Sequence, residues 1–180
     1  MQRVDGDRAG FTLVELLLAM ALGSLLSGVA VQMLLGEARS SGGLARRLQL
    51  RGWQRRTLAL VKQDLDRASS WQVRPESSRI WPCALAGRQP RLAITPRDGS
   101  AVVVYSIGAA PSPIWRGPVL MRCGPAFTLD GRPSSGAYQN RVVLDGVERF
   151  AVDDPPELPM LLMQLEQRSG DQLIRSSAVG

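Results

Sequence analysis

The chain has 180 residues, with 22 basic against 16 acidic side chains and a formal net charge of +6. It contains two cysteines and no histidine, which excludes histidine-based catalytic triads and the common zinc sites. The length suits one modest domain plus a membrane helix. No enzymatic site is visible in the sequence, and we expect no cofactor, no metal and no small-molecule substrate.

The N-terminal part is a polar leader followed by an apolar segment. Residues 1–9 are polar, Gly10 follows, and an apolar run then covers residues 11–35 with one charge, Glu15. As a helix of about 25 residues it would extend roughly 37 Å, enough to span the hydrocarbon core of a membrane with some tilt. A charge inside such a segment costs roughly 2.5–3.5 kcal/mol, so Glu15 is by default a functional residue.

The string G-F-T-L-V-E-L-L at residues 10–17 resembles the class III signal of type IV prepilins and type II secretion pseudopilins. The resemblance implies that a prepilin peptidase cuts between Gly10 and Phe11 and then N-methylates the Phe11 amine. It also implies that Glu15 docks the subunit into a growing filament by pairing with the N-terminal amine of a neighbour. A carboxylate in lipid gains much from such a cationic partner.

Two other interpretations of this segment stay open. Residues 11–35 could form an ordinary single-pass anchor, although that does not explain Glu15. Alternatively, residues 1–21 could be a conventional secretory signal with Ala19-Met20-Ala21 as its cleavage site. Against this, the apolar run continues well past Ala21 and contains a glutamate.

Residues 36–69 are predicted to form a helical extension beyond the membrane. The sequence S-S-G-G at residues 40–43 predicts a kink or a local melt, because two adjacent glycines cost about 2 kcal/mol of helix propensity. Helical periodicity resumes over residues 44–68. The predicted apolar stripe of this helix is Leu44, Leu48, Leu58, Val61, Leu65 and Ala68.

A basic face accompanies that stripe. Arg47, Arg51 and Arg55 are spaced i, i+4, i+8 on one side of the helix, and no acidic residue occurs between Glu37 and Asp64. Three interpretations stay open for this face. It could pair with acidic residues of neighbouring subunits, it could contact anionic lipid headgroups or only solvent, or it could contact DNA phosphates.

Short runs typical of strands follow. We predict strands near residues 71–74, 91–95, 101–107, 118–123, 140–144, 147–152 and 159–167, with a further one at 171–175. Turn signals separate them, and the connections are too short for crossover helices, so we expect antiparallel order. The predicted fold class is α+β: a long N-terminal helix packed on an antiparallel β-rich head.

Two smaller features lie in this predicted head. In an oxidising compartment Cys83 and Cys123 would pair, and two buried free thiols are the alternative. The acidic residues Asp153, Asp154 and Glu157 lie in a proline-rich loop without the ligand spacing of known calcium loops, so we expect a solvated loop. Asp64 and Asp66, near the end of the predicted helix, are also expected to be solvated.

The order of these segments is similar to that of the larger minor pilins and J-type pseudopilins, including the segment L-D-G-V-E-R-F at residues 144–150. We expect a cleaved leader at 1–10, a transmembrane and filament-core helix at 11–35, a periplasmic helical extension at 36–69 and a head at 70–180. The implied function is a minor pilin of a type IV pilus. A type II secretion pseudopilin and a membrane-anchored binding protein are the alternatives.

The same resemblance implies partners and a location. The expected partners are the prepilin peptidase and methyltransferase, other pilin or pseudopilin subunits and inner-membrane lipids. DNA is a further, less favoured partner. The expected location is the bacterial inner membrane, with the head in the periplasm, and then a filament.

Overall fold

The computed structural model describes residues 12–134, 136–158, 160–170 and 172–180, with the side chains of residues 34 and 37–42 left out. The chain forms two compact units, residues 1–46 and residues 47–180. Gly10 and Phe11, the two residues of the predicted cleavage site, lie outside the described residues.

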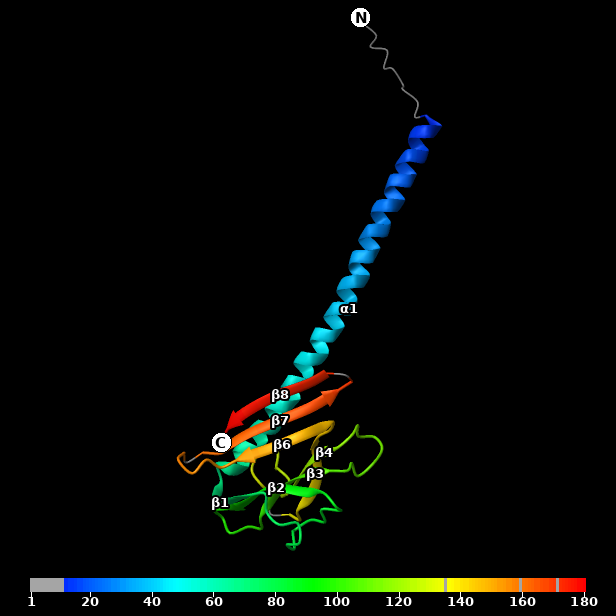
Figure 1. Cartoon of the computed structure of the whole chain (residues 1–180). Coiled ribbons are helices and arrows are strands. Elements are labelled where there is room, and N and C mark those ends of the chain that lie inside the picture. The colour runs from blue at the N-terminus through cyan, green and yellow to red at the C-terminus, as the bar shows by residue number, and fades with distance from the viewer. Residues whose placement is uncertain (1–11, 135, 159, 171) are drawn as a thin grey trace, which may run out of the picture. The chain divides into compact units, whose positions relative to one another are not determined.

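One helix, α1 (Leu13–Leu65), contains 53 residues and contributes to both units (Figure 1). Thr12 caps it: the Thr12 hydroxyl oxygen accepts a hydrogen bond from the Glu15 amide at 3.4 Å. The Leu16 amide donates to the Thr12 carbonyl at 3.2 Å. Threonine is a favoured N-cap because its oxygen satisfies an amide that has no partner inside the helix.

The first unit carries the candidate membrane span. Leu13–Met33 is a stretch of 21 residues with a mean hydropathy of 2.0, and none of it is buried. By length and composition it can cross a membrane. Its large apolar side chains are all more than half exposed, so no described residue of the chain covers them.

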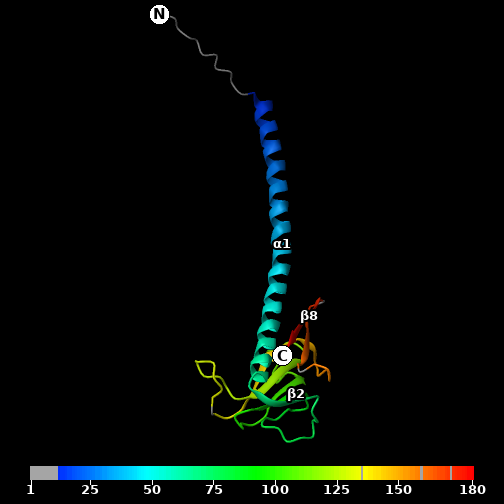
Figure 2. The same ribbon diagram turned by 90° about the vertical axis from the view of Figure 1, so that its left-hand side faces the viewer.

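The local melt expected at residues 40–43 is wrong. The helix continues through Gly42 and Gly43 without interruption (Figure 2). The propensity cost of two glycines is small beside the cost of ending a helix and nucleating a second one, which explains the continuity. The predicted C-terminal end was also too late, because α1 ends at Leu65 and a strand begins at Ala68.

The second unit contains two antiparallel sheets, which together with α1 confirm the α+β class. A five-stranded sheet has the order β1-β2-β3-β4-β5, and a three-stranded sheet has the order β6-β7-β8. The bounds of the strands are β1 (Ala68–Val73), β2 (Gln89–Pro96), β3 (Val103–Gly108), β4 (Val119–Gly124), β5 (Gln139–Leu144), β6 (Val147–Asp153), β7 (Leu162–Ser169) and β8 (Gln172–Val179).

The core lies between the last turns of α1 and the two sheets. Leu58, Val61 and Leu65 of α1 are buried in one cluster with residues of both sheets, among them Tyr105 and Phe150. Leu44 and Leu48, predicted for the same stripe, are exposed instead. Among the large apolar residues of α1, burial begins at Leu50, so the core covers only the later part of the predicted stripe.

Asp145 and Gly146 form the turn between β5 and β6. Gly146 has a φ of 62°, and a Cβ there would lie 2.8 Å from the Arg168 carbonyl oxygen. The Gly146 amide donates to the Arg116 carbonyl at 2.7 Å. Only glycine combines this backbone conformation with so close an approach.

Candidate functional site

The start of α1 places Glu15 in the first helical turn. A threonine followed three residues later by glutamate is the capping-box pattern. The hydrogen bond from the Glu15 amide to the Thr12 hydroxyl is one of the two hydrogen bonds of that pattern. A carboxylate there is also favoured by the positive end of the helix dipole. Within the described residues the Glu15 side chain forms no ion pair, so its carboxylate is free to accept one from outside the chain.

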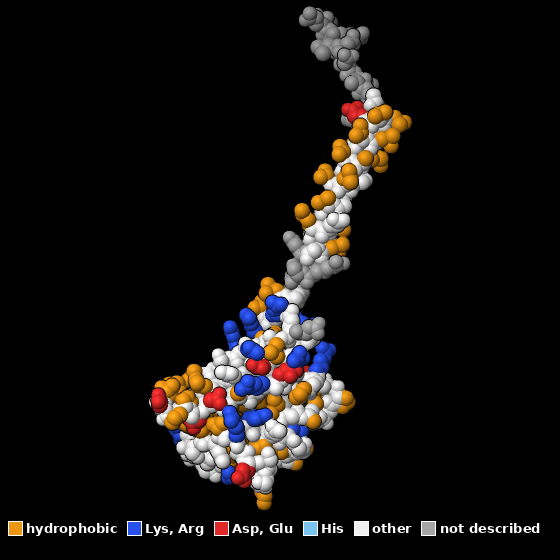
Figure 3. Space-filling view, viewed as in Figure 1, with side chains coloured by type: hydrophobic (Ala, Val, Ile, Leu, Met, Phe, Trp, Pro, Cys, Tyr) orange, Lys and Arg blue, Asp and Glu red, His pale blue; other side chains and the backbone are white. Residues whose placement is uncertain are grey.

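The surface of the candidate span is apolar on all sides. Leu13 is 74% exposed and Leu26 is 72% exposed, and hydrophobic side chains line the visible face of the first half of α1 (Figure 3). The Ser24 hydroxyl is satisfied by the Met20 carbonyl at 2.8 Å. This segment therefore suits an apolar environment, either lipid or the helices of other subunits.

The basic face predicted on α1 is exposed. Arg47, Arg51 and Arg55 all lie on the surface of the second unit. The Arg47 Nε donates to the Gln172 Oε1 at 2.8 Å, which fixes that guanidinium on a neutral partner. Arg51 and Arg55 form no hydrogen bond or ion pair with any described residue.

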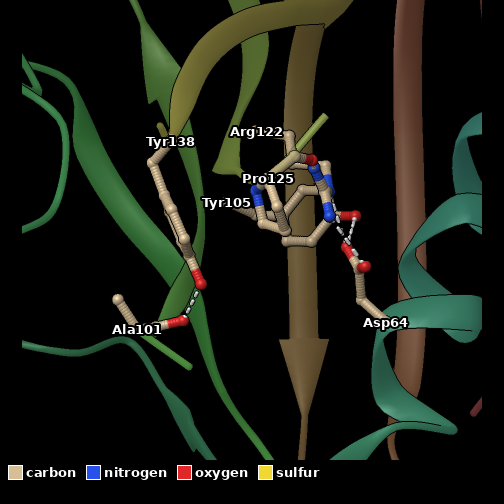
Figure 4. A network of polar contacts seen from close by, with 6 residues as sticks. All are labelled: Asp64, Ala101, Tyr105, Arg122, Pro125 and Tyr138. Carbon is tan, nitrogen blue, oxygen red and sulfur yellow. Dashed lines mark hydrogen bonds and ion pairs between the residues drawn. The ribbon is translucent and has the colours of Figure 1, made fainter. Parts of the chain in front are cut away.

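A buried polar network joins the end of α1 to the five-stranded sheet (Figure 4). Asp64 accepts hydrogen bonds from the Tyr105 hydroxyl at 2.6 Å and from the Arg122 Nε at 2.7 Å. A second Arg122 nitrogen donates to the other Asp64 oxygen at 2.9 Å, and a third donates to the Pro125 carbonyl. The expectation that Asp64 is solvated is therefore wrong, whereas Asp66 is exposed as expected.

The electrostatics of this network favour one protonation state. Burial raises the pKa of the Tyr105 hydroxyl well above its ordinary value, and the negative charge of Asp64 raises it further. Burial alone would lower the pKa of Arg122, but the hydrogen bonds and the charge of Asp64 outweigh it and raise that pKa. The Asp64 carboxylate accepts hydrogen bonds on both oxygens, so the network stabilises the packing of α1 against the sheet and is not arranged as a reactive site.

The two cysteines form a disulfide, as expected. Cys83, in the loop between β1 and β2, is bonded to Cys123 of β4 across 40 residues of sequence. Cys123 follows Arg122 directly, so the disulfide and the buried network hold the same strand. The bond ties the loop to β4, an inner strand of the five-stranded sheet.

The acidic loop residues have partners within the head. Asp153 forms an ion pair with Arg74 at 3.3 Å, and Asp154 accepts a hydrogen bond from the Trp71 indole at 3.1 Å. Within the described ranges no group of three or more acidic or cysteine side chains could hold a metal ion. Asp153, Asp154 and Glu157 are exposed as expected, but Asp153 is the last residue of β6 and not part of a loop.

Sequence reasoning missed the buried network. Tyr105 and Arg122 are far from Asp64 in the sequence, and each lies in a strand that is largely apolar and buried. A charged residue in an otherwise buried strand, such as Arg122, is the one signal that could have indicated a buried partner.

Comparison with known proteins bears on the N-terminal segment. Residues 6–31 match a family model described as the prokaryotic N-terminal methylation motif. The match includes Gly10, Phe11 and Glu15 and most of the candidate span. Neither a curated protein nor a solved structure matches the chain.

Proposed function

We propose that this chain, which carries the class III signal shared by type IV pilins and pseudopilins, is a minor pilin of a type IV pilus. The observation that carries the proposal is the methylation motif at residues 6–31, which includes most of an apolar helix that no other described residue covers. Its work is assembly: the helix enters a filament core and the head faces outward.

Maturation is the first proposed step. A prepilin peptidase removes residues 1–10, and the same enzyme methylates the new amine of Phe11. Because the cut precedes the apolar segment, the membrane helix stays on the mature protein. The mature subunit then waits in the inner membrane with its head outside the cytoplasm, where the Cys83–Cys123 disulfide is stable.

Docking is the second proposed step. The carboxylate of Glu15, exposed in the first turn of α1, pairs with the N-terminal amine of a neighbouring subunit. In an apolar surrounding the desolvated charges attract each other strongly, and either charge alone would be costly. The exposed apolar side chains of Leu13–Met33 would then pack against neighbouring helices instead of lipid.

Arg47, Arg51 and Arg55 are proposed as a contact face for neighbouring molecules. They project from the part of α1 that the head leaves exposed, and Arg51 and Arg55 have no acidic partner among the described residues. Acidic groups of neighbouring subunits fit them best in an assembled filament, with lipid headgroups and DNA as the other candidates.

Cell fractionation tests this function. The chain is expressed with its own processing and assembly genes, filaments are sheared from the cells, and the chain is detected with an antibody to the head. A pilus subunit is recovered at mature size in the sheared filaments. Recovery only with a periplasm-spanning secretion complex would identify a pseudopilin instead. Absence from both would favour a membrane-anchored binding protein.

A further inference from the structure

The outer edge of β8 has free main-chain groups. β8 is the last strand of the sheet β6-β7-β8 (Figure 1). Leu161 and Gly180 exchange two hydrogen bonds, of 2.9 and 3.0 Å, and the register to β7 continues from there without a bulge. Hydrogen-bonded pairs alternate along an antiparallel ladder, so every second residue of β8 directs its amide and carbonyl away from β7. These residues are Leu173, Arg175, Ser177 and Val179.

No described residue fills this edge. The hydrogen bonds outside the regular ladders include none to the main chain of those four residues, and all four are exposed. An open edge of this kind is a template for another strand unless the protein covers it. Here the neighbouring element, α1, packs on the face of the sheet and not along its edge.

A buried glutamine fixes α1 beside β8. Gln54 is fully buried, its Nε2 donates to the Ile174 carbonyl at 3.0 Å, and its Oε1 accepts from the Ser176 hydroxyl at 2.5 Å. Two grooves open on this junction. One, of about 590 Å³, is lined by Arg47, Arg51 and residues 172–175. The other, of about 370 Å³, is lined by Arg55, Leu58, Ala59, Lys62 and residues 176–178.

The two grooves follow β8 from its first to its last residues and carry positive charge throughout. Within the described part of the chain, Arg47 has one hydrogen-bond partner, the neutral Gln172, and Arg51, Arg55 and Lys62 have no acidic partner. Arg175 is the exception, because Glu166 neutralises it at 2.9 Å. Lys and Arg side chains gather where α1 meets β8 (Figure 3).

We propose that the grooves between α1 and β8 bind an extended, acidic segment of a neighbouring filament subunit, which adds a fourth strand to the sheet β6-β7-β8. Main-chain hydrogen bonds to the outer edge of β8 supply the affinity, as in other cases of strand addition. Carboxylates on the added strand pair with Arg47, Arg51, Arg55 and Lys62, which selects an acidic strand over a neutral or basic one. The identity of the partner as a filament subunit rests on the proposed function, whereas the binding chemistry does not.

A defined peptide tests the chemistry on the full-length chain in detergent micelles. The probe is a blocked, fluorescent peptide of alternating glutamate and valine with the length of β8, eight residues. One control peptide carries lysine for glutamate. The other control keeps the glutamates but has alternate main-chain amides methylated. It is made in two versions, one for each alternate set of amides, so that in one of them the amides facing β8 cannot donate. Binding is measured by anisotropy, and hydrogen exchange of the β8 amides is followed in parallel.

The acidic peptide is expected to bind and to slow exchange at Leu173, Arg175 and Ser177. Amide methylation, and the double variant Arg51→Glu with Arg55→Glu, should each weaken binding by about tenfold or more. The matched control is Arg132→Glu with Arg141→Glu, which changes the net charge equally at exposed arginines outside the grooves and should leave binding unchanged.

Three results would overturn the proposal: no binding of the acidic peptide up to about 1 mM, equal binding of the methylated peptide, or equal binding of a single-stranded oligonucleotide that competes at the same site. The proposed pilin function is tested separately from strand addition, and it fails if Phe11 is never the mature N-terminus. If maturation and filament recovery are both normal but β8 exchanges as fast in filaments as in micelles, strand addition by a neighbouring subunit is refuted while the pilin function stands.

Discussion

The Asp64 carboxylate and the Arg122 guanidinium form a two-pronged ion pair between the last turn of α1 and β4. The two contacts are 2.7 and 2.9 Å, and the side chains are only 5% and 7% exposed. This pair is the main polar connection between the helix that would enter a filament and the head that the filament would display. Its geometry leads to the first prediction.

Asp64→Asn should destabilise the head by about 3–5 kcal/mol, because Arg122 would remain buried without a counter-charge. Chemical unfolding of the full-length chain in micelles, followed by near-UV circular dichroism, measures this difference. The matched control is Asp153→Asn, which breaks the exposed pair with Arg74 and should cost less than about 1 kcal/mol. Equal losses in the free energy of unfolding for the two substitutions would show that the buried pair does not stabilise the head more than an exposed one.

The alkaline stability of the head should depend on Tyr105. Its pKa in the folded chain is raised by burial and by Asp64, from an ordinary value of 10.0. Folding therefore favours the neutral hydroxyl. The contribution of Tyr105 to the free energy of unfolding is complete below pH 10 and is lost as the pH rises toward the raised pKa of the folded chain. Above pH 10 the free energy of unfolding should fall by at most about 1.4 kcal/mol per pH unit from this group.

Tyr105→Phe is the comparison for that measurement. The variant loses the hydrogen bond to Asp64 at every pH, but its stability should fall less steeply above pH 10 than that of the parent chain. Parallel curves of the free energy of unfolding against pH for the two proteins would contradict the assignment of the alkaline loss of stability to Tyr105. Unfolding is monitored over pH 8 to 11 with the disulfide intact.

Removal of the disulfide should destabilise the head without changing its fold. The loop closed by Cys83 and Cys123 spans 40 residues, for which the chain-entropy model gives about 4 kcal/mol. The double variant Cys83→Ser with Cys123→Ser is compared with the parent chain by chemical unfolding. A loss below about 1 kcal/mol would indicate that the loop is already held in place by its other contacts.

Glu15→Ala should separate processing from assembly. The cleavage site is unchanged, so the variant should still reach mature size, but without the carboxylate its recovery in sheared filaments should fall by about tenfold or more. Glu157→Ala, an exposed head residue, is the control. Normal recovery of the Glu15 variant, at a normal level of total protein, would refute the docking role.

Substitution of Gly10 tests the cleavage site itself. A bulky residue, as in Gly10→Val, should block the peptidase sterically, so that only the full-length precursor accumulates. Immunoblots of membranes resolve precursor from mature chain. A mature-sized band from this variant would contradict the assigned site.

The α+β class and the antiparallel strand order could be predicted because they depend on local patterns, and the disulfide could be predicted because the chain has only two cysteines. Alternating runs such as that of β3, and short turn sequences, can be recognised from residues that are adjacent in the sequence. The strand bounds agree to within a few residues. The resemblance at residues 10–17 carries most of the proposed function, and the head adds only the weaker likeness of residues 144–150.

The remaining features depend on residues brought together from distant parts of the chain. Asp64 looks like a solvated helix-end carboxylate until β3 and β4 bring Tyr105 and Arg122 to it. The break expected at Gly42-Gly43 failed because local propensity is weaker than helix continuity. The arginines of α1 were visible as a stripe, but only the fold shows that they lie beside the open edge of β8.

The most direct test of the central claim is mass spectrometry of the N-terminal peptide. The chain is isolated from membranes of cells that contain its natural peptidase and is digested. Assignment as a pilin subunit predicts a mature chain that begins at Phe11 with a methylated amine. An N-terminus that remains at Met1, or one that begins at Leu22 after a conventional signal cleavage, would contradict it.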